Sequence, residues 1–209
     1  MKQILRNMSL VMVAMTLVFS SCEDDLDGSG SVNGHDYVDL GLPSGLKWAT
    51  CNVGANSPEG YGNYYAWGET TTKSSYSRSN SLTYRRDMDD ISGNANYDAA
   101  TANWGGTWRM PTKSEMKELA NNCNWTWTTQ NGVNGMRVTG PNAKSIFLPA
   151  AGYYSGESYR EVGEEGYYWS STPYESDTSD ACRLNFLSGY HFVDQFTRFL
   201  GHTVRPVSE

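Results

Sequence analysis

One segment of the 209-residue sequence has a clear helical pattern, and it constrains the fold more than any other feature. In residues 111–123, Thr112 and Glu115 have the spacing of a capping box, which starts a helix by satisfying free backbone N–H groups. Met116 and Leu119 then recur at helical spacing, so we expect them to pack against the core. With a single strong helix, the chain must build most of its fold from other elements.

The remaining segments are short and strand-like, separated by turn residues. The expected strands are 37–40, 47–51, 64–67, 136–138, 146–148, 167–169, 182–187, 190–196 and 203–207. A polar stretch over 74–96 indicates a surface insertion, and 98–104 indicates a short helix. This order predicts an α+β fold rather than alternating βαβ units. We expect the first strand, 37–40, to pair with 204–207 at the C-terminus.

Twelve apolar residues are predicted to form the core. They are Val38, Leu40, Trp48, Trp67, Trp108, Met116, Leu119, Leu148, Trp169, Leu184, Phe186 and Val204.

Composition excludes several classes of protein. Aromatic residues make up 13% and charged residues 19% of the chain, which argues against disorder and against a coiled coil. The net charge of −7 gives no basic footprint, so we expect no nucleic-acid partner.

The N-terminus has the pattern of an export signal. Lys2 and Arg6 precede an apolar run over 8–19, which is too short to span a bilayer comfortably. The run leads into Cys22 in a way that resembles a bacterial lipobox, which implies a cysteine acylated as a membrane anchor. The acidic stretch 23–27 resembles the signal that sends Bacteroidota lipoproteins to the outer face of the outer membrane.

These patterns divide the chain into a signal peptide over 1–21, an acylated cysteine and flexible acidic, Gly/Ser-rich tether over 22–34, and one folded domain over 35–209. We therefore expect an outer-membrane lipoprotein that faces the cell exterior.

The sequence offers little catalytic chemistry. It lacks the GxSxG, HExxH and P-loop patterns and any CxxC pair, so we predict no catalytic residues, no metal site and no cofactor. Beyond Cys22, the cysteines Cys51, Cys123 and Cys182 are expected as buried thiols or as one disulfide with one thiol left over. An alternative is a glycan-active enzyme with Glu164, Asp194 and His191 in one cleft. Another alternative is a structural component of the cell surface or of a fimbria-like assembly.

Seven strings, read together, resemble the Fibrobacter succinogenes major paralogous domain of Bacteroidota lipoproteins. They are YVDLGLPSG (37–45), WATCNVGA (48–55), YAWGE (65–69), GTWRMPT (106–112), LPAAG (148–152), YWSST (168–172) and VRPV (204–207). The resemblance implies a C-type-lectin-like fold related to the formylglycine-generating enzymes, with short antiparallel strands, long loops and one well-capped helix. The copper-binding cysteines of those enzymes have no counterpart here, because the C-terminal part has only Cys182. The calcium-binding motifs of lectins are also missing.

Some proteins of this fold are targets of diversity-generating retroelements, which rewrite the coding sequence of the C-terminal segment. The C-terminal segment of this chain resembles theirs. Residues 190–199 of this chain mix aromatic, charged and apolar side chains, as contact surfaces do. We therefore predict an adhesion or recognition protein that binds a protein or glycan ligand through this region, without catalysis. The expected contacts are Arg183, Asn185, Tyr190, His191, Phe192, Asp194, Gln195, Thr197, Arg198 and Phe199. The alternative is an ordinary hairpin of core and surface residues.

Overall fold

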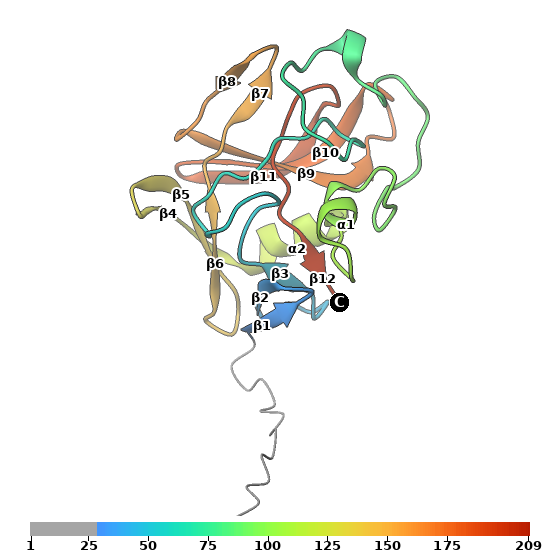
Figure 1. Ribbon diagram of the computed structural model, residues 1–209. Helices are drawn as coiled ribbons and strands as arrows, with labels where there is room; N and C mark the ends of the chain where they lie inside the picture. Colours follow the sequence, from blue (N-terminus) through green and yellow to red (C-terminus); the bar gives the residue numbers. More distant parts are fainter. Residues whose placement is uncertain (1–28) are drawn as a thin grey trace, which may run out of the picture.

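The computed structural model describes residues 29–209. It is a β-rich fold of mostly short antiparallel strands with few helices (Figure 1). The strands are β1 (Ser29–Val32), β2 (His35–Asp39), β3 (Lys47–Ala49), β4 (Asn124–Gln130), β5 (Val133–Thr139), β6 (Ser145–Pro149), β7 (Tyr153–Ser155), β8 (Ser158–Arg160), β9 (Glu165–Pro173), β10 (Asp180–Leu187), β11 (Tyr190–Thr197) and β12 (Val207–Ser208). The helices are η1 (Arg78–Asn80), α1 (Ala99–Trp104) and α2 (Lys113–Asn122).

The two ends of the described chain share one sheet, in the order β1-β2-β3-β12. The expected direct pairing of the first and last strands is wrong, because β3 lies between them. Trp48 of β3 is opposite Val38 on one side and opposite Val207 on the other. A short loop after β2 reverses the chain, so β3 pairs with β2 along one edge. Its other edge pairs with β12.

The folded part begins earlier than the sequence predicts. Residues 29–34 were expected in the flexible tether, but β1 forms a hairpin with β2. Asn33 and Gly34 form its turn with φ angles of 48° and 80°, as a tight hairpin turn with two positive φ angles requires. The indole of Trp108 donates a hydrogen bond of 2.8 Å to the carbonyl of Val32, which fixes the hairpin to the domain. The signal peptide, Cys22 and the acidic stretch lie outside the described residues.

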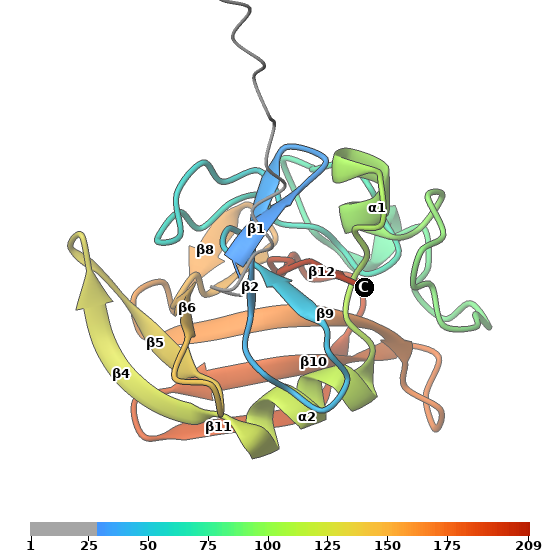
Figure 2. The same cartoon turned by 90° about the horizontal axis from the view of Figure 1, so that it is seen from below.

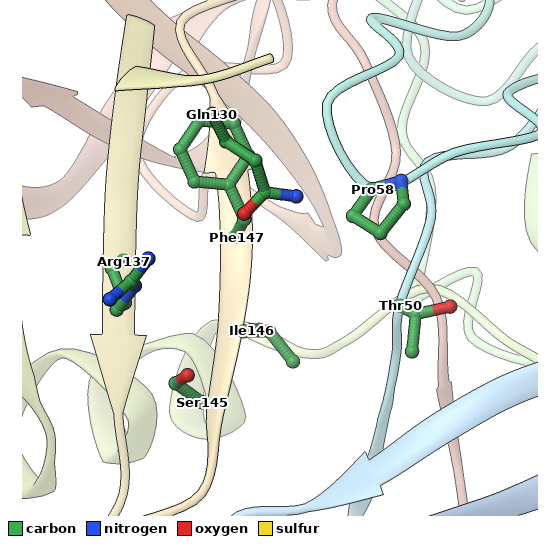
Figure 3. Close-up of a pocket in the computed structure, with 7 residues that line it drawn as sticks. All are labelled: Thr50, Pro58, Gln130, Arg137, Ser145, Ile146 and Phe147. Atoms are coloured by element: carbon green, nitrogen blue, oxygen red, sulfur yellow. The ribbon is translucent and has the colours of Figure 1, made fainter. Parts of the chain in front are cut away.

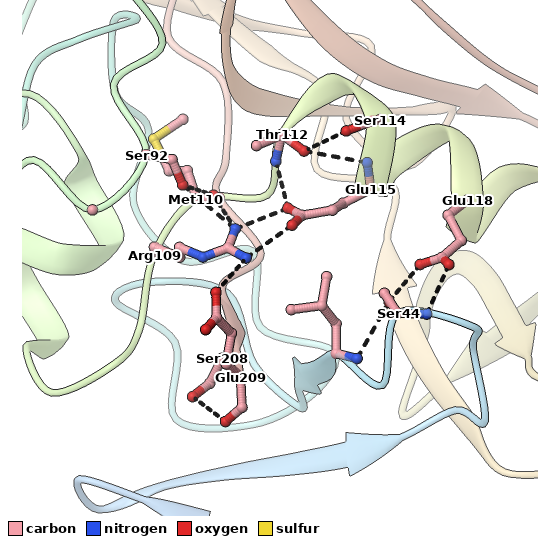
Figure 4. Close-up of polar contacts among 12 residues, drawn as sticks. Ser44, Ser92, Arg109, Met110, Thr112, Ser114, Glu115, Glu118, Ser208 and Glu209 are labelled. Carbon is pink, nitrogen blue, oxygen red and sulfur yellow. Dashed lines mark hydrogen bonds and ion pairs between the residues drawn. The ribbon is translucent and has the colours of Figure 1, made fainter.

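The capping box of α2 is confirmed. The backbone N–H of Glu115 donates to the Thr112 hydroxyl over 3.3 Å, and the Glu115 carboxylate accepts from the Thr112 N–H over 2.8 Å. Arg109 then binds both oxygens of Glu115 at 2.8 Å (Figure 4). The Trp-Arg-Met-Pro-Thr string over 108–112 therefore has a structural role, which is to hold the start of the helix.

Helix α2 packs against one face of the sheet β9–β10–β11, and the two views agree on this layering (Figure 2). All of the predicted core residues are buried except Val38, which is partly buried against the core. The predicted insertion over 74–96 is irregular apart from η1. It is not purely a surface element, because Tyr76, Thr83 and Ile91 are buried. Cys51, Cys123 and Cys182 are free thiols.

Candidate functional site

The sheet β9–β10–β11 has two faces with different surroundings. Side chains alternate along each strand, so Leu184 and Val193 point toward α2 and pack with its Leu119. Arg183, which is opposite both Asp194 and Trp169, points to the other side. At the Trp169 end this second face is covered by a separate cluster of buried residues around Trp67 and Trp108. At the hairpin end Tyr190 and Phe192 are exposed, and we call this part of the face the outer sheet face. It consists of Tyr167, Arg183, Asn185, Tyr190, Phe192 and Asp194.

Arg183 is a buried cation on the outer sheet face, opposite Asp194 in the sheet. Its side chain is buried, and its Nε donates to the Asp194 carboxylate over 2.9 Å. The guanidinium carbon is 3.9 Å from the ring centre of Phe196 and 4.5 Å from that of Tyr167. These contacts fix the arginine between two aromatic rings, where a cation is attracted to the ring faces. Within residues 29–209, its Nη1 atom has no hydrogen-bond partner.

Two further carboxylates meet at the hydroxyl of Tyr167. The hydroxyl is 2.7 Å from a Glu165 oxygen and also contacts Glu161. A hydroxyl has a single hydrogen, so it can donate to only one of the two carboxylates at a time. The amide of Asn185 donates to Glu165 over 3.2 Å. Neither glutamate forms an ion pair with another described residue, so the pair is left with unused acceptor capacity.

Two large side chains project from β11 at the open end of this face. Tyr190 is 69% exposed and Phe192 is 42% exposed. Phe192 is opposite Asn185 in the sheet, and Asp194 follows it on the same face. The face therefore combines exposed aromatic rings with the carboxylates of Asp194 and Glu165.

The structure brings together half of the predicted contact residues. The five that share the outer sheet face are Arg183, Asn185, Tyr190, Phe192 and Asp194.

The other five predicted residues lie elsewhere. His191 points toward α2, where its ring stacks on Trp125 at 4.5 Å and its Nε2 is 3.1 Å from the Ala120 carbonyl. Gln195 is exposed on that same opposite side, by strand alternation. Thr197 ends the strand, and its hydroxyl is 3.4 Å from the carbonyl of Ser179.

Arg198 is the clearest correction, because its side chain is buried rather than displayed. It donates to the carbonyls of Asp180 and Arg86 over 2.9 and 2.8 Å and lies 4.3 Å from the ring centre of Trp67. Phe199 packs edge-on against Tyr84 at 5.5 Å, also away from the outer sheet face. Both residues therefore hold the insertion against the domain.

Sequence reasoning missed the glutamates and Tyr167 as site residues. The register of β9 against β10 places Glu165 opposite Leu187 and Tyr167 opposite Asn185. That register is not visible in the sequence.

The proposed catalytic set is not assembled. His191 and Asp194 are on opposite faces of β11, and Glu164 is exposed in the turn before β9. His202 is fully buried and stacks on Trp169 at 3.9 Å. Burial lowers the pKa of His202 well below its ordinary value, so it is neutral. Residues 29–209 contain no group of three or more His, Cys, Asp or Glu side chains that could hold a metal ion.

Residues 41–208 match the family described as the Lcl C-terminal domain. The chain belongs to this family. The match covers nearly all of the folded part, and membership fits a surface lipoprotein of the kind expected from the sequence. No curated protein and no solved structure matches the chain.

The Lcl C-terminal domain also has hollows away from the outer sheet face. One, of about 260 Å³, lies between the sheet β4–β5–β6 and the loop after β3. Figure 3 shows Arg137 and Gln130 on the sheet side and Pro58 and Thr50 across from them. Among the described residues, no helix is long and apolar enough to cross a membrane.

Proposed function

We propose that the chain is a surface lipoprotein that binds a protein ligand through the outer sheet face, without catalysing a reaction. The observation that carries this proposal is the exposure of Tyr190 and Phe192 beside a rigid polar centre. Aromatic side chains of this kind give most of the binding energy in protein interfaces, because they bury a large area at a small entropic cost. The flat surface of a sheet suits an extended macromolecular partner better than a small molecule.

The ligand should present basic groups. Asp194 is neutralised by Arg183, whereas Glu161 and Glu165 compete for the single hydrogen of Tyr167. A lysine or arginine side chain of a partner would supply the missing donors and balance the charge. The net charge of −7 also attracts a basic ligand over longer distances.

The fold is proposed to be a C-type-lectin-like variant. Support comes from the shared sheet of the two chain ends and from the separate sheet that presents the C-terminal hairpin. We also propose that the exposed β11 positions are the diversified ones. A reverse-transcriptase gene with a near-copy of the coding sequence for 180–199 beside this gene would support that proposal, and its absence would remove it.

The proposed location is the outer face of the outer membrane, with Cys22 as the lipid anchor. Cells that express the full chain should incorporate radiolabelled palmitate into it, and the Cys22→Ser variant should lose the label. If the wild-type chain remains unlabelled, the anchor assignment is wrong.

The binding proposal is tested with a phage library of random dodecamer peptides selected on the immobilised full chain. We expect the selected peptides to be enriched in Lys and Arg, and their affinity to fall at least tenfold with Tyr190→Ala or Phe192→Ala. Tyr97→Ala and Leu82→Ala are matched controls, since these side chains are 39% and 60% exposed elsewhere. Peptides that bind both β11 variants as tightly as the wild type would refute the proposal.

A further inference from the structure

A second group of aromatic side chains surrounds a groove on another part of the surface. It lies between the β7–β8 hairpin and the loop that follows β3, and Figure 1 shows this hairpin projecting from the rest of the fold. We call it the tyrosine groove. It is formed by Tyr61, Tyr64, Tyr76, Tyr154 and Tyr159.

The groove has an apolar half and a polar half. The apolar half is a hollow of about 430 Å³ that Tyr61 and Val162 help to line. The polar half is a hollow of about 230 Å³ that includes Asn63, Thr72 and Lys73. The two hollows adjoin, because Gly62, Tyr64 and Tyr159 line both of them. Their sizes fit a small ligand or part of a chain.

The deep tyrosines are held in fixed positions. The hydroxyl of Tyr64 donates to the Ala151 carbonyl over 2.5 Å, and the hydroxyl of Tyr76 donates to the carbonyl of Tyr64. Burial raises the pKa of Tyr76 to about 12, so its hydroxyl keeps its hydrogen. Gly201 lies directly beneath, where an added Cβ would be 2.9 Å from the Tyr76 ring. A preorganised floor of this kind lowers the entropic cost of binding.

The rim is open to a ligand. Tyr159 is 60% exposed, although its ring contacts Tyr154 edge-on at 4.6 Å and Tyr64 at 5.2 Å. An exposed tyrosine supported by two others presents an apolar ring face in a fixed orientation.

The groove has no free charge to offer an ionic ligand. Lys73, the one cation among the described residues that line the groove, is 2.7 Å from the Glu69 carboxylate and also donates to the carbonyl of Asn80. Uncharged polar groups also line the polar half, among them the Asn63 amide and the hydroxyls of Thr72 and Tyr159, which can donate and accept hydrogen bonds. The groove therefore complements a neutral ligand that carries several hydroxyl groups.

We propose that the tyrosine groove binds a neutral carbohydrate chain. A pyranose ring has a face of C–H groups, which matches the ring face of Tyr159, and a rim of hydroxyls, which matches the polar half. This site is separate from the outer sheet face and does not depend on the function proposed for it. The β7–β8 hairpin lies between the two sites, since Tyr153 packs on Tyr167 of the sheet while Tyr154 lines the groove.

The test is native affinity electrophoresis of the full chain in a detergent without a sugar headgroup. The probes are four neutral polysaccharides, namely mixed-linkage β-glucan, arabinoxylan, α-mannan and glycol chitin. Dextran sulfate tests for an anionic ligand and polyproline for a proline-rich peptide. We expect at least one neutral polymer to retard the wild-type protein. We expect Tyr159→Ala and Tyr61→Ala to weaken that binding at least tenfold, and Tyr159→Phe to weaken it less. Tyr97→Ala serves as the control for loss of an exposed tyrosine elsewhere.

The outcomes separate the two proposals. Tyr190→Ala should leave polysaccharide binding unchanged, because it alters only the outer sheet face. The carbohydrate proposal is overturned if none of the four polymers retards the wild type, or if Tyr159→Ala binds them equally well. Retardation by dextran sulfate or polyproline alone would also overturn it, in favour of an anionic ligand or a proline-rich peptide.

Discussion

Replacement of Arg198 by alanine tests most sharply whether this residue belongs to the core or to the ligand surface. The side chain is buried, and its guanidinium donates to three carbonyls, those of Asp180, Arg86 and Thr83, at 2.9, 2.8 and 3.3 Å. Hydrogen bonds from a charged donor contribute roughly 1.5–3 kcal/mol each, and the stacking on Trp67 adds about 2 kcal/mol. Burial lowers the pKa of Arg198, which shows that desolvation offsets part of this gain.

We therefore expect Arg198→Ala to lower the free energy of unfolding by about 4 kcal/mol. For a domain of this size, that corresponds to a fall in melting temperature of about 12 °C. Urea unfolding followed by tryptophan fluorescence gives the free energy, and calorimetry gives the melting temperature. Arg198→Lys keeps the charge but not the planar fork, so it should lose an intermediate amount. A loss below about 1 kcal/mol would refute the structural role.

Three other changes have defined outcomes. Burial lowers the pKa of His202, so below pH 6.5 the unfolded chain takes up a proton that the folded chain does not. The free energy of unfolding should therefore fall below pH 6.5 by up to about 1.4 kcal/mol per pH unit. In urea titrations at pH 5–7, His202→Phe should reduce this slope. Glu115→Gln weakens both the helix cap and the ion pair with Arg109, so the free energy of unfolding in urea should fall by about 1–2 kcal/mol. An unchanged midpoint of the urea transition would contradict the assigned cap. Partial burial raises the pKa of Cys123 to about 11, so at pH 8 its alkylation, followed by mass spectrometry, should be about 100-fold slower than for a free thiol. Equal rates would contradict this partly buried environment.

The features that the sequence predicted correctly are those with local causes. The capping box of α2 depends on Thr112 and Glu115, three residues apart, so the sequence contains all the information needed. The buried tryptophans Trp48, Trp67, Trp108 and Trp169 follow from size and hydrophobicity alone.

The missed features depend on contacts between distant residues. Arg198 looks like a surface charge in the sequence, and only the carbonyls of Thr83 and Arg86, more than a hundred positions away, explain its burial. The sequence indicated that 190–199 was unusual, but the face of each side chain is set by the position of α2 beneath the sheet. His191 was therefore placed on the wrong face.

The tyrosine groove gave no sequence signal either. Tyr61 and Tyr159 are far apart in the sequence, and only the fold brings their loop and hairpin together. The strands β4, β7 and β8 were missed because each is stabilised by its partner rather than by its own composition. The Asn33–Gly34 pair, by contrast, is a local hairpin signal that the sequence did contain.

Binding of a ligand to the outer sheet face can be mapped residue by residue. An NMR titration of the isotope-labelled full chain with a peptide from the phage selection identifies the backbone amides whose signals shift. If the peptide binds there, the shifted signals concentrate in residues 183–185 and 190–194, with Tyr190 and Phe192 among the largest. Shifts confined to the tyrosine groove, or to α2 and the opposite face of the sheet, would contradict binding at the outer sheet face.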